Sequence, residues 1–419
     1  MRRVRLRSWF CVEVDQEPKS KSIKKEDAIY FQNKVLEALK KRCKRAYNSP
    51  IVLQIDFYTS QKTPPGIHSL AKNYLDLLKD PVPGLKIKCR KVLYNDDRQV
   101  KLLIVNYHLG EGPAIHIQAE TLRSFICDLD LIRRIQADDF EEGNKFDDYE
   151  LSDARDELDD KLTGDDLDDD DFTVRELREL ESQKDPYIKK LGLKSYLAYR
   201  NMLIRGIQHN YLKSRQLDIN WLLSIFPSFY LHEKSRATGI ELYKNIAHMG
   251  RNFVSTIGIH LPSKPTNKEK TKEFKEEIKR TFENFKKKYP VLFPLTSVLG
   301  VTVLFLPPKG EITDLDNLAR KYIVPFINEI VQPPRHYVET INIDDMTDDP
   351  LKKHFLEELS RLPKDPRYSI VQYQIIEVPR IADDSPEGYI RLFFNDGSYE
   401  SNLWAKLKHI LDEWEDSLD

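Results

Sequence analysis

The chain has few cysteines and no long apolar run, and each absence excludes a class of protein. Its four cysteines are spread over the first third of 419 residues, with no pair at the spacing of a zinc or redox motif. We therefore expect reduced thiols in a reducing compartment and no structural zinc. No stretch of about 18 apolar residues is present, and the N-terminal segment alternates like a strand and has no signal-peptide core. The expected location is the cytoplasm, without membrane association.

Acidic and basic side chains are segregated along the chain, although the formal net charge is only −2. Asp138 to Asp171 holds 18 acidic residues against three basic ones, about −15, which leaves about +13 for the rest. A segment with this charge cannot bury itself, and it lacks the spaced oxygen ligands and closing glutamate of an EF-hand loop. Residues 136–172 are therefore expected to be an acidic disordered linker.

Basic residues gather in three segments that also contain aromatic side chains. Such patches are typical of proteins that neutralise nucleic-acid phosphates. A solvated helix face has the same composition, so both interpretations stay open at this point. The three segments are Lys19 to Arg45, Lys86 to Arg98 and Lys264 to Lys288.

Two series of six expected elements follow one another in the order strand, helix, strand, helix, strand, strand. A glycine precedes the last strand of each series, at Gly112 and Gly388. This recurrence indicates a duplicated domain. The first series is expected at Arg3 to Val14, Lys24 to Arg45, Ile51 to Tyr58, Ile67 to Leu78, Val100 to Tyr107 and Ala114 to Gln118. The second is expected at Phe253 to Leu261, Lys268 to Lys288, Val301 to Leu306, Leu315 to Val331, Ile370 to Val378 and Tyr389 to Phe394.

Helices are also expected outside the two series. The predicted organisation is a domain at 1–135, the linker at 136–172, a helical connecting region at 173–250, a second domain at 251–400 and a C-terminal helix at 401–419. The additional helical segments are Thr121 to Ile135, Val174 to Ser214, Ile219 to Tyr243 and Ser401 to Leu418.

Two carboxylates and an amide open one helix of the second series. Asp314, Asp316 and Asn317 follow the apolar strand Val301 to Leu306. Hard oxygen ligands at the ends of rigid elements are a common way to build a divalent-metal site. Helix capping is the alternative, because an aspartate at a helix start accepts amide hydrogen bonds and complements the dipole. Capping explains either aspartate, but not both together with Asn317.

With this element order and the run from Asp314 to Tyr322, the chain resembles the RusA-like Holliday junction resolvases. The resemblance covers roughly Arg3 to Gln118 and Phe253 to Phe394. It implies an α+β fold in which two β-α-β-α-β-β domains form a pseudo-dimer within one chain. It also implies cleavage of branched DNA with Mg²⁺ (or Mn²⁺) held by aspartates. The family pattern is a strand, D-x-D-N-x-x-K opening a helix, and D-D before the next strand. Neither copy keeps this pattern whole.

The second copy matches the first motif directly, and the resemblance implies that it holds the metal. The second aspartate element is expected at Asp365, at the entrance of its strand, and not at Asp344 and Asp345 in an insertion. A lysine or arginine beside the metal would stabilise charge that develops during phosphodiester cleavage. The implied metal ligands are Asp314, Asp316, Asn317 and Asp365, and the implied catalytic residues are Asp314, Asp316, Asp365, Arg320 and Lys321.

The first copy has the opposite losses. Gly66, His68 and Ser69 stand where the pattern has two aspartates and the asparagine. Lys72 and the pair Asp96-Asp97 keep the lysine and the D-D of the pattern. The resemblance implies a degenerate site that is catalytically silent and helps to hold DNA. His68 is interpreted as a cap or surface residue, with metal ligation as the alternative. The degenerate site consists of His68, Asp96 and Asp97.

The resemblance implies that each metal site lies largely within one half of the pseudo-dimer. The alternative is a composite site, in which Asp96 and Asp97 of the first half face Asp314 and Asp316 of the second. In either case a single working site should nick DNA and not resolve a junction.

Two functions follow from this reading. The first is a magnesium-dependent, structure-selective endodeoxyribonuclease that acts on branched DNA. The second is a catalytically inactive RusA-like protein that binds DNA or serves as a scaffold. A third possibility is that the acidic linker folds over the basic surface and competes with DNA. The expected DNA-binding residues are Lys72, Lys264, Lys268, Lys272 and Arg367.

Overall fold

The computed structural model contains an eight-stranded mixed sheet flanked by helices, so the protein belongs to the α+β class. None of the helices in the described part of the chain has the length and apolar character needed to span a bilayer. The structure describes residues 9–20, 23–41, 45–61, 64–85, 90–109, 112–129, 131, 172–214, 259–261, 265, 267–288, 299–311, 314–330, 370–380, 385–395, 397, 405, 408–409 and 411–412.

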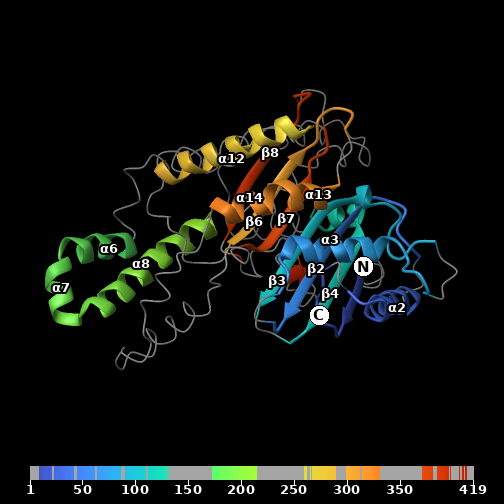
Figure 1. Cartoon of the computed structure of the whole chain (residues 1–419), viewed down its shortest axis with the longest axis horizontal. Coiled ribbons are helices and arrows are strands. Elements are labelled where there is room, and N and C mark those ends of the chain that lie inside the picture. Colours follow the sequence, from blue (N-terminus) through green and yellow to red (C-terminus); the bar gives the residue numbers. More distant parts are fainter. Residues whose placement is uncertain are drawn as a thin grey trace, which may run out of the picture.

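Eight strands form the sheet (Figure 1). They are β1 (Phe10–Val14), β2 (Ile51–Thr59), β3 (Val100–Leu109), β4 (Ala114–Thr121), β5 (Ile259–Leu261), β6 (Leu299–Leu306), β7 (Ile370–Glu377) and β8 (Tyr389–Asn395). Their order across the sheet is β1-β4-β2-β3-β7-β6-β8-β5. β3 and β7 pair antiparallel at the centre, so the two halves of the chain share one sheet.

Strand pairing repeats in the two halves. The pairs β2 with β3 and β6 with β7 are parallel, and every other pair is antiparallel. Both parallel pairs have a register irregularity at their first residues, between Ile51 and Val52 and between Leu299 and Gly300. The order of the second set is the reverse of the first, as a twofold axis between β3 and β7 would produce.

The helices agree closely with the expected segments. They are α2 (Lys25–Lys41), α3 (Ile67–Lys79), the 3₁₀ helix η1 (Asp97–Gln99), α6 (Phe172–Ser182), α7 (Lys184–Leu191), α8 (Leu193–Ser214), α12 (Lys268–Lys288), α13 (Leu315–Leu318), the π-helical turn η3 (Ala319–Ile323) and α14 (Val324–Ile330). Two expected helices are divided. A π turn interrupts the one that begins at Leu315, and breaks at Gln183 and Gly192 separate α6, α7 and α8.

One face of the sheet carries the main hydrophobic core, because side chains alternate between the two faces along each strand. Leu53, Ile55 and Phe57 of β2 are buried in the same cluster as the apolar residues of α2, α3, α12 and α13. Gln54 and Asp56 lie on the opposite face, where they are also buried. Figure 1 shows α3 and α13 on the core-bearing face, over the strands at the centre of the sheet.

The glycines before β4 and β8 differ in their structural requirement. Gly388 has a φ of 70°, and a Cβ there would lie 2.1 Å from the carbonyl oxygen of Leu306. A Cβ at Gly112 would meet open space. Only Gly388 is therefore required for steric reasons.

Several expected segments lie outside the described residues. These are the acidic linker expected at 136–172 apart from Phe172, which begins α6, the helix expected at Ile219 to Tyr243, the first part of the strand expected at Phe253 to Leu261, and most of the C-terminal helix.

Candidate functional site

Helices α3 and α13 meet over the centre of the sheet, where the two halves join. α13 follows β6 in the second half, but it contacts α3 and β3 of the first half. The residues that open α13 therefore face residues of α3 and not only their own half. A contact of this kind between the two halves is what the composite alternative requires.

Lys72 of α3 lies at the centre of this contact. Its ammonium is 2.8 Å from Oδ1 of Asp76 on the same helix and 3.2 Å from Oδ2 of Asp316 on α13. It is also 3.8 Å from Oδ2 of Asp97 on η1. The contact with Asp316 is an ion pair without a well-directed hydrogen bond. One cation thus joins carboxylates from three elements and both halves.

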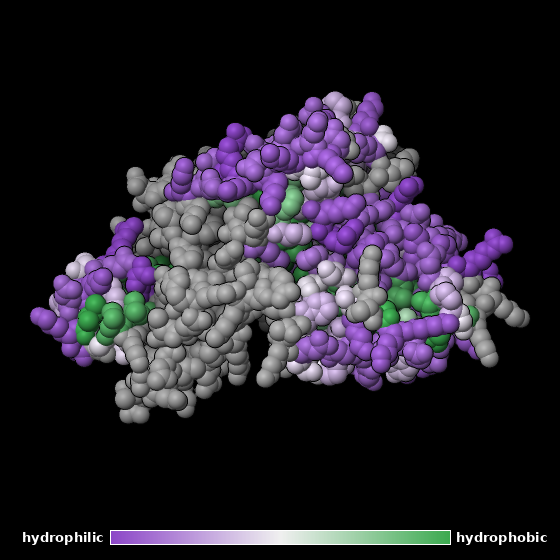
Figure 2. Space-filling model, in the orientation of Figure 1, coloured by the Kyte–Doolittle hydropathy of each residue, from purple (hydrophilic) through white to green (hydrophobic). Residues whose placement is uncertain are grey.

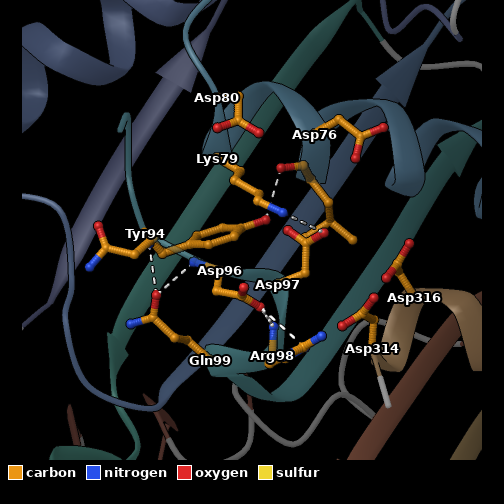
Figure 3. Close-up of polar contacts among 12 residues, drawn as sticks. Asp76, Lys79, Asp80, Tyr94, Asp96, Asp97, Arg98, Gln99, Asp314 and Asp316 are labelled. Atoms are coloured by element: carbon orange, nitrogen blue, oxygen red, sulfur yellow. Dashed lines mark hydrogen bonds and ion pairs between the residues drawn. The ribbon is translucent and has the colours of Figure 1, made fainter. Parts of the chain in front are cut away.

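A second lysine completes what we call the acidic cluster, which consists of Lys72, Asp76, Lys79, Asp97 and Asp316. The Lys79 ammonium lies 3.4 Å from Oδ2 of Asp97. Figure 3 shows Lys79 and Asp97 together with Asp316, which comes from the second half. Burial is nearly complete for Asp316, which is 4% exposed. Asp316 is therefore shielded from solvent, and its charge interacts with Lys72 more strongly than a surface charge would.

The electrostatics of the acidic cluster leave it short of positive charge. Burial raises the pKa of Asp97, and the charges of Asp316 and Asp314 raise it further, against the lowering effect of Lys79 and Lys72. Oδ1 of Asp97 is buried and receives no hydrogen bond from any described residue. A buried carboxylate oxygen without a donor is costly, so this atom favours a cationic partner.

Lys72 remains charged in this environment. Burial alone would lower its pKa, but the hydrogen bond to Asp76 and the charge of Asp316 outweigh burial and raise the pKa. The fully buried Tyr94 and Tyr373 lie close enough for Asp316 to raise the pKa of both hydroxyls, in addition to the larger effect of burial. Both rings are themselves buried.

The adjacent aspartates of the first half have different roles. Asp96 accepts a hydrogen bond from the backbone N–H of Arg98 at 2.9 Å and caps η1. The Gln99 side chain accepts the Asp96 N–H at 2.8 Å and completes a capping box (Figure 3). The Asp96 side chain is 51% exposed, whereas that of Asp97 is 12% exposed. Asp96 is thus structural, and Asp97 belongs to the acidic cluster.

Asp314 stands at the N-cap position of α13, but its side chain makes no capping hydrogen bond. Its Oδ2 instead accepts from Nδ2 of Asn317 at 3.2 Å. Oδ1 of Asn317 in turn accepts from Nη2 of Arg320 at 3.3 Å. Capping by a side chain therefore does not explain Asp314, and Asn317 links it to the guanidinium group of Arg320.

Arg320 lies beside His68 of the first half. The pKa of His68 is lowered, mainly by burial and further by the charge of Arg320. In the motif alignment Arg320 matches Lys72, and His68 matches Asp316. The pair of Arg320 with His68 is thus the counterpart of the pair of Lys72 with Asp316.

The remaining expected site residues lie on the surface or outside the described residues. Lys321 is exposed on η3, and Lys268 and Lys272 are exposed on α12, whose surface is hydrophilic (Figure 2). Those outside the described residues are Lys264, Asp365 and Arg367.

Sequence reasoning missed Asp76 and Lys79 as parts of the cluster. A signal was available, because Lys72, Asp76 and Lys79 lie at positions i, i+4 and i+7, which share one face of a helix. The contact of that face with Asp316 has no local signal, since it depends on how the two halves dock.

The carboxylate oxygens of Asp97, Asp314 and Asp316 are the donor type that Mg²⁺ prefers. The orphaned Oδ1 of Asp97 also fits a cation. Within the described ranges, however, no three His, Cys, Asp or Glu side chains are grouped closely enough to hold a metal ion. A metal between Asp97 and Asp316 would take the place that the Lys72 ammonium holds. Lys72 could then remain paired with Asp76, which lies on its own helix.

Comparison of the chain with models of protein families, with curated proteins and with solved structures found no match.

Proposed function

We propose that the chain is a RusA-like pseudo-dimer that nicks branched DNA with Mg²⁺ (or Mn²⁺) at one composite site. The observation that carries this proposal is the convergence of Asp316 from the second half with Asp97 and Lys72 from the first. The repeated strand pairing across the β3 and β7 junction supports the duplicated-domain part of the proposal.

The losses in the two copies support a composite site. The second copy keeps both aspartates of D-x-D-N, and the first keeps the D-D pair. If each site drew its residues from one half, both sites would be incomplete. If D-x-D-N of one half works with D-D of the other, one site keeps Asp314, Asp316 and Asp97. Only the reciprocal site, which contains Gly66 and His68, then lacks its aspartates.

In this proposal Asp97, Asp314 and Asp316 hold the metal, which would stabilise negative charge on the reacting phosphate oxygens. The Lys72 ammonium would stay beside the site and stabilise charge that develops on the phosphate. Tyr94 and Tyr373 would limit water on the inner side. The formal charges of four aspartates, including Asp76, and two lysines sum to −2, which matches one divalent cation.

The test is cleavage of a labelled four-way DNA junction by the purified chain with Mg²⁺. We expect a nick in one strand, and we expect both Asp316→Asn and Asp97→Asn to lower the rate by on the order of 100-fold or more. Asp97 lies in the first half, so its requirement distinguishes a composite site from a site confined to the second half. Cleavage that survives Asp97→Asn would contradict the composite site.

Asp96→Asn is the matched control, because it makes the same chemical change one residue away, at an exposed capping position. We expect it to keep cleavage within a few-fold of the unmodified chain. Equal losses for Asp96→Asn and Asp97→Asn would indicate a general effect on η1 and would count against a metal role for Asp97.

The second candidate function is a catalytically inactive RusA-like protein that binds branched DNA. It is favoured by the position of the Lys72 ammonium, which already forms ion pairs with Asp316 and Asp76. In that case Lys72 replaces the metal permanently. The same assay separates the two functions, because the inactive protein would bind the junction in a salt-sensitive manner and give no magnesium-dependent product.

A further inference from the structure

The counterpart of the acidic cluster has the opposite charge. We call it the basic site and define it as His68, Arg320 and the N-terminus of α3. α3 contacts η3, which brings Arg320 of the second half to His68 of the first. At the acidic cluster a lysine faces a carboxylate, whereas at the basic site an arginine faces an imidazole. The histidine at this position carries no negative charge.

Two polar atoms of the basic site are buried without hydrogen-bond partners among the described residues. These are Nε of Arg320 and Nδ1 of His68. The guanidinium Nε–H can only donate, so it requires an acceptor. Arg320 already uses Nη2 to donate to Asn317 at 3.3 Å. An acceptor that reaches both the guanidinium group and the imidazole would satisfy both orphaned atoms.

The backbone adds to the positive character of the basic site. α3 begins after Gly66, where no side chain caps the helix, and its first turn contains no acidic residue. The positive end of the helix dipole is therefore not offset locally. The His68 ring packs against Gly66, since a Cβ at Gly66 would lie 3.2 Å from Cε1 of His68. The imidazole is thus held at the helix N-terminus.

We propose that the basic site binds a phosphate group of the DNA backbone. A phosphodiester supplies the acceptor oxygens that Arg320 and His68 lack, and guanidinium groups form strong charge-assisted hydrogen bonds with phosphate. The inference rests on the proposed function for its ligand, DNA, but not on metal binding or cleavage. It assigns opposite tasks to the two related sites: the acidic cluster binds a cation and the basic site binds an anion.

The test measures binding of a fluorescent four-way junction by anisotropy in EDTA, over a series of salt concentrations. We expect Arg320→Ala to weaken binding by about 5- to 10-fold near 0.1 M salt and to reduce the slope of log K against log salt by about 0.9, as for one lost phosphate contact. His68→Asp restores a negative charge, and we expect it to weaken binding at least as much. Arg320→Lys keeps the charge and should retain most of the slope.

Lys189→Ala is the matched control, because it removes one positive charge from α7, far from α3 in the molecule (Figure 1). Circular dichroism melts of each variant identify a change that is due to misfolding, and Arg320→Lys provides a second variant if Arg320→Ala does not fold. The basic site would be overturned if Arg320→Ala and His68→Asp bound the junction with the same affinity and the same salt slope as Lys189→Ala.

The outcomes for the two proposals are separable. A reduced slope for Arg320→Ala without any magnesium-dependent cleavage would support the basic site and reject the nuclease. Cleavage by the unmodified chain with no effect of Arg320→Ala on binding would support the nuclease and reject the basic site. No binding of the junction by the unmodified chain would reject both.

Discussion

Replacement of Lys72 by methionine tests whether the acidic cluster is a cation site. Methionine keeps an unbranched stem and removes only the charge. The substitution leaves Asp316, which is 4% exposed, and Asp97, whose side chain is 12% exposed, without their shared cation. Removal of one partner from a buried ion pair costs about 3 to 5 kcal/mol.

The expected loss is smaller than this range for two structural reasons. Lys79 remains 3.4 Å from Asp97 and still compensates it. The contact with Asp76 is an i,i+4 pair with a half-exposed carboxylate, which contributes only about 0.3 to 0.5 kcal/mol. We therefore expect Lys72→Met to lower the free energy of unfolding by about 2 to 4 kcal/mol in EDTA. Equilibrium urea unfolding followed by circular dichroism measures this loss.

Magnesium should reverse much of the loss if the cluster can hold it. An ion that binds only the folded state stabilises it by about 2.7 kcal/mol at a concentration of 100 times its Kd. The gain on adding Mg²⁺ should be larger in Lys72→Met than in the unmodified chain, because the ion no longer competes with the ammonium. Calcium and sodium at matched ionic strength control for general screening.

The double variant Lys72→Met with Asp316→Asn isolates the pair. Removal of both charges avoids a buried unpaired carboxylate, so the double variant should be more stable than Lys72→Met alone in EDTA and should lose the magnesium effect. A loss below about 1 kcal/mol for Lys72→Met would refute the buried cluster. A full loss that Mg²⁺ leaves unchanged would refute the metal position, while the ion-pair network would stand.

Two further predictions follow from single residues. Burial raises the pKa of Asp97, so its proton competes with Mg²⁺ at a higher pH than for an ordinary aspartate. Calorimetry should therefore show weaker Mg²⁺ binding as the pH falls toward this raised pKa, and Asp97→Asn should lack this pH dependence. For the same reason the metal-free folded state binds this proton more tightly than the unfolded chain does. The free energy of unfolding should therefore rise as the pH falls through the folded-state pKa of Asp97, because protonation removes the destabilising charge. Urea titrations of Asp97→Asn should lack this rise. Gly388→Ala should destabilise the fold by more than about 1 kcal/mol, because Gly388 has a positive φ and a Cβ there would meet the Leu306 carbonyl. Gly112→Ala is the control and should have little effect. Equal melting temperatures for the two variants would contradict this prediction.

Secondary structure was predictable because it depends on local patterns. β6 is an uninterrupted buried run, and α3 has an apolar stripe that a periodicity of 3.6 residues reveals. The expected α12, Lys268 to Lys288, has the bounds that the structure gives. The π turn η3 was missed, although the sequence has a signal for it: Pro325 lies inside the expected helix and cannot donate a hydrogen bond to the carbonyl of Lys321 in η3.

The approach of Asp316 to Lys72 and Asp97 was not predictable in the same way, because it depends on how β3 meets β7. Residues Leu102 to Asn106 pair with Gln372 to Ile376, and Lys101 forms an ion pair of 2.7 Å with Glu377 across the same junction. These partners are separated by more than 250 positions in the chain. Charge type identified Asp316 and Asp97 as candidates, but only the docking of the two halves brings them to one lysine.

The asymmetry of the two sites suggests why a duplicated domain would lose its aspartates reciprocally. Each contact between α3 and the α13 to η3 segment contains one position from each half, so a single substitution changes only one site. At one contact Lys72 faces Asp316, and at the other Arg320 faces His68. A homodimer cannot make this distinction, because a change in one subunit appears in both. In the proposed pseudo-dimer, fusion of the two copies would permit one contact to bind a cation and the other an anion. Two strands of a branched DNA would then meet chemically different sites, which is the condition for cutting one strand while holding the other.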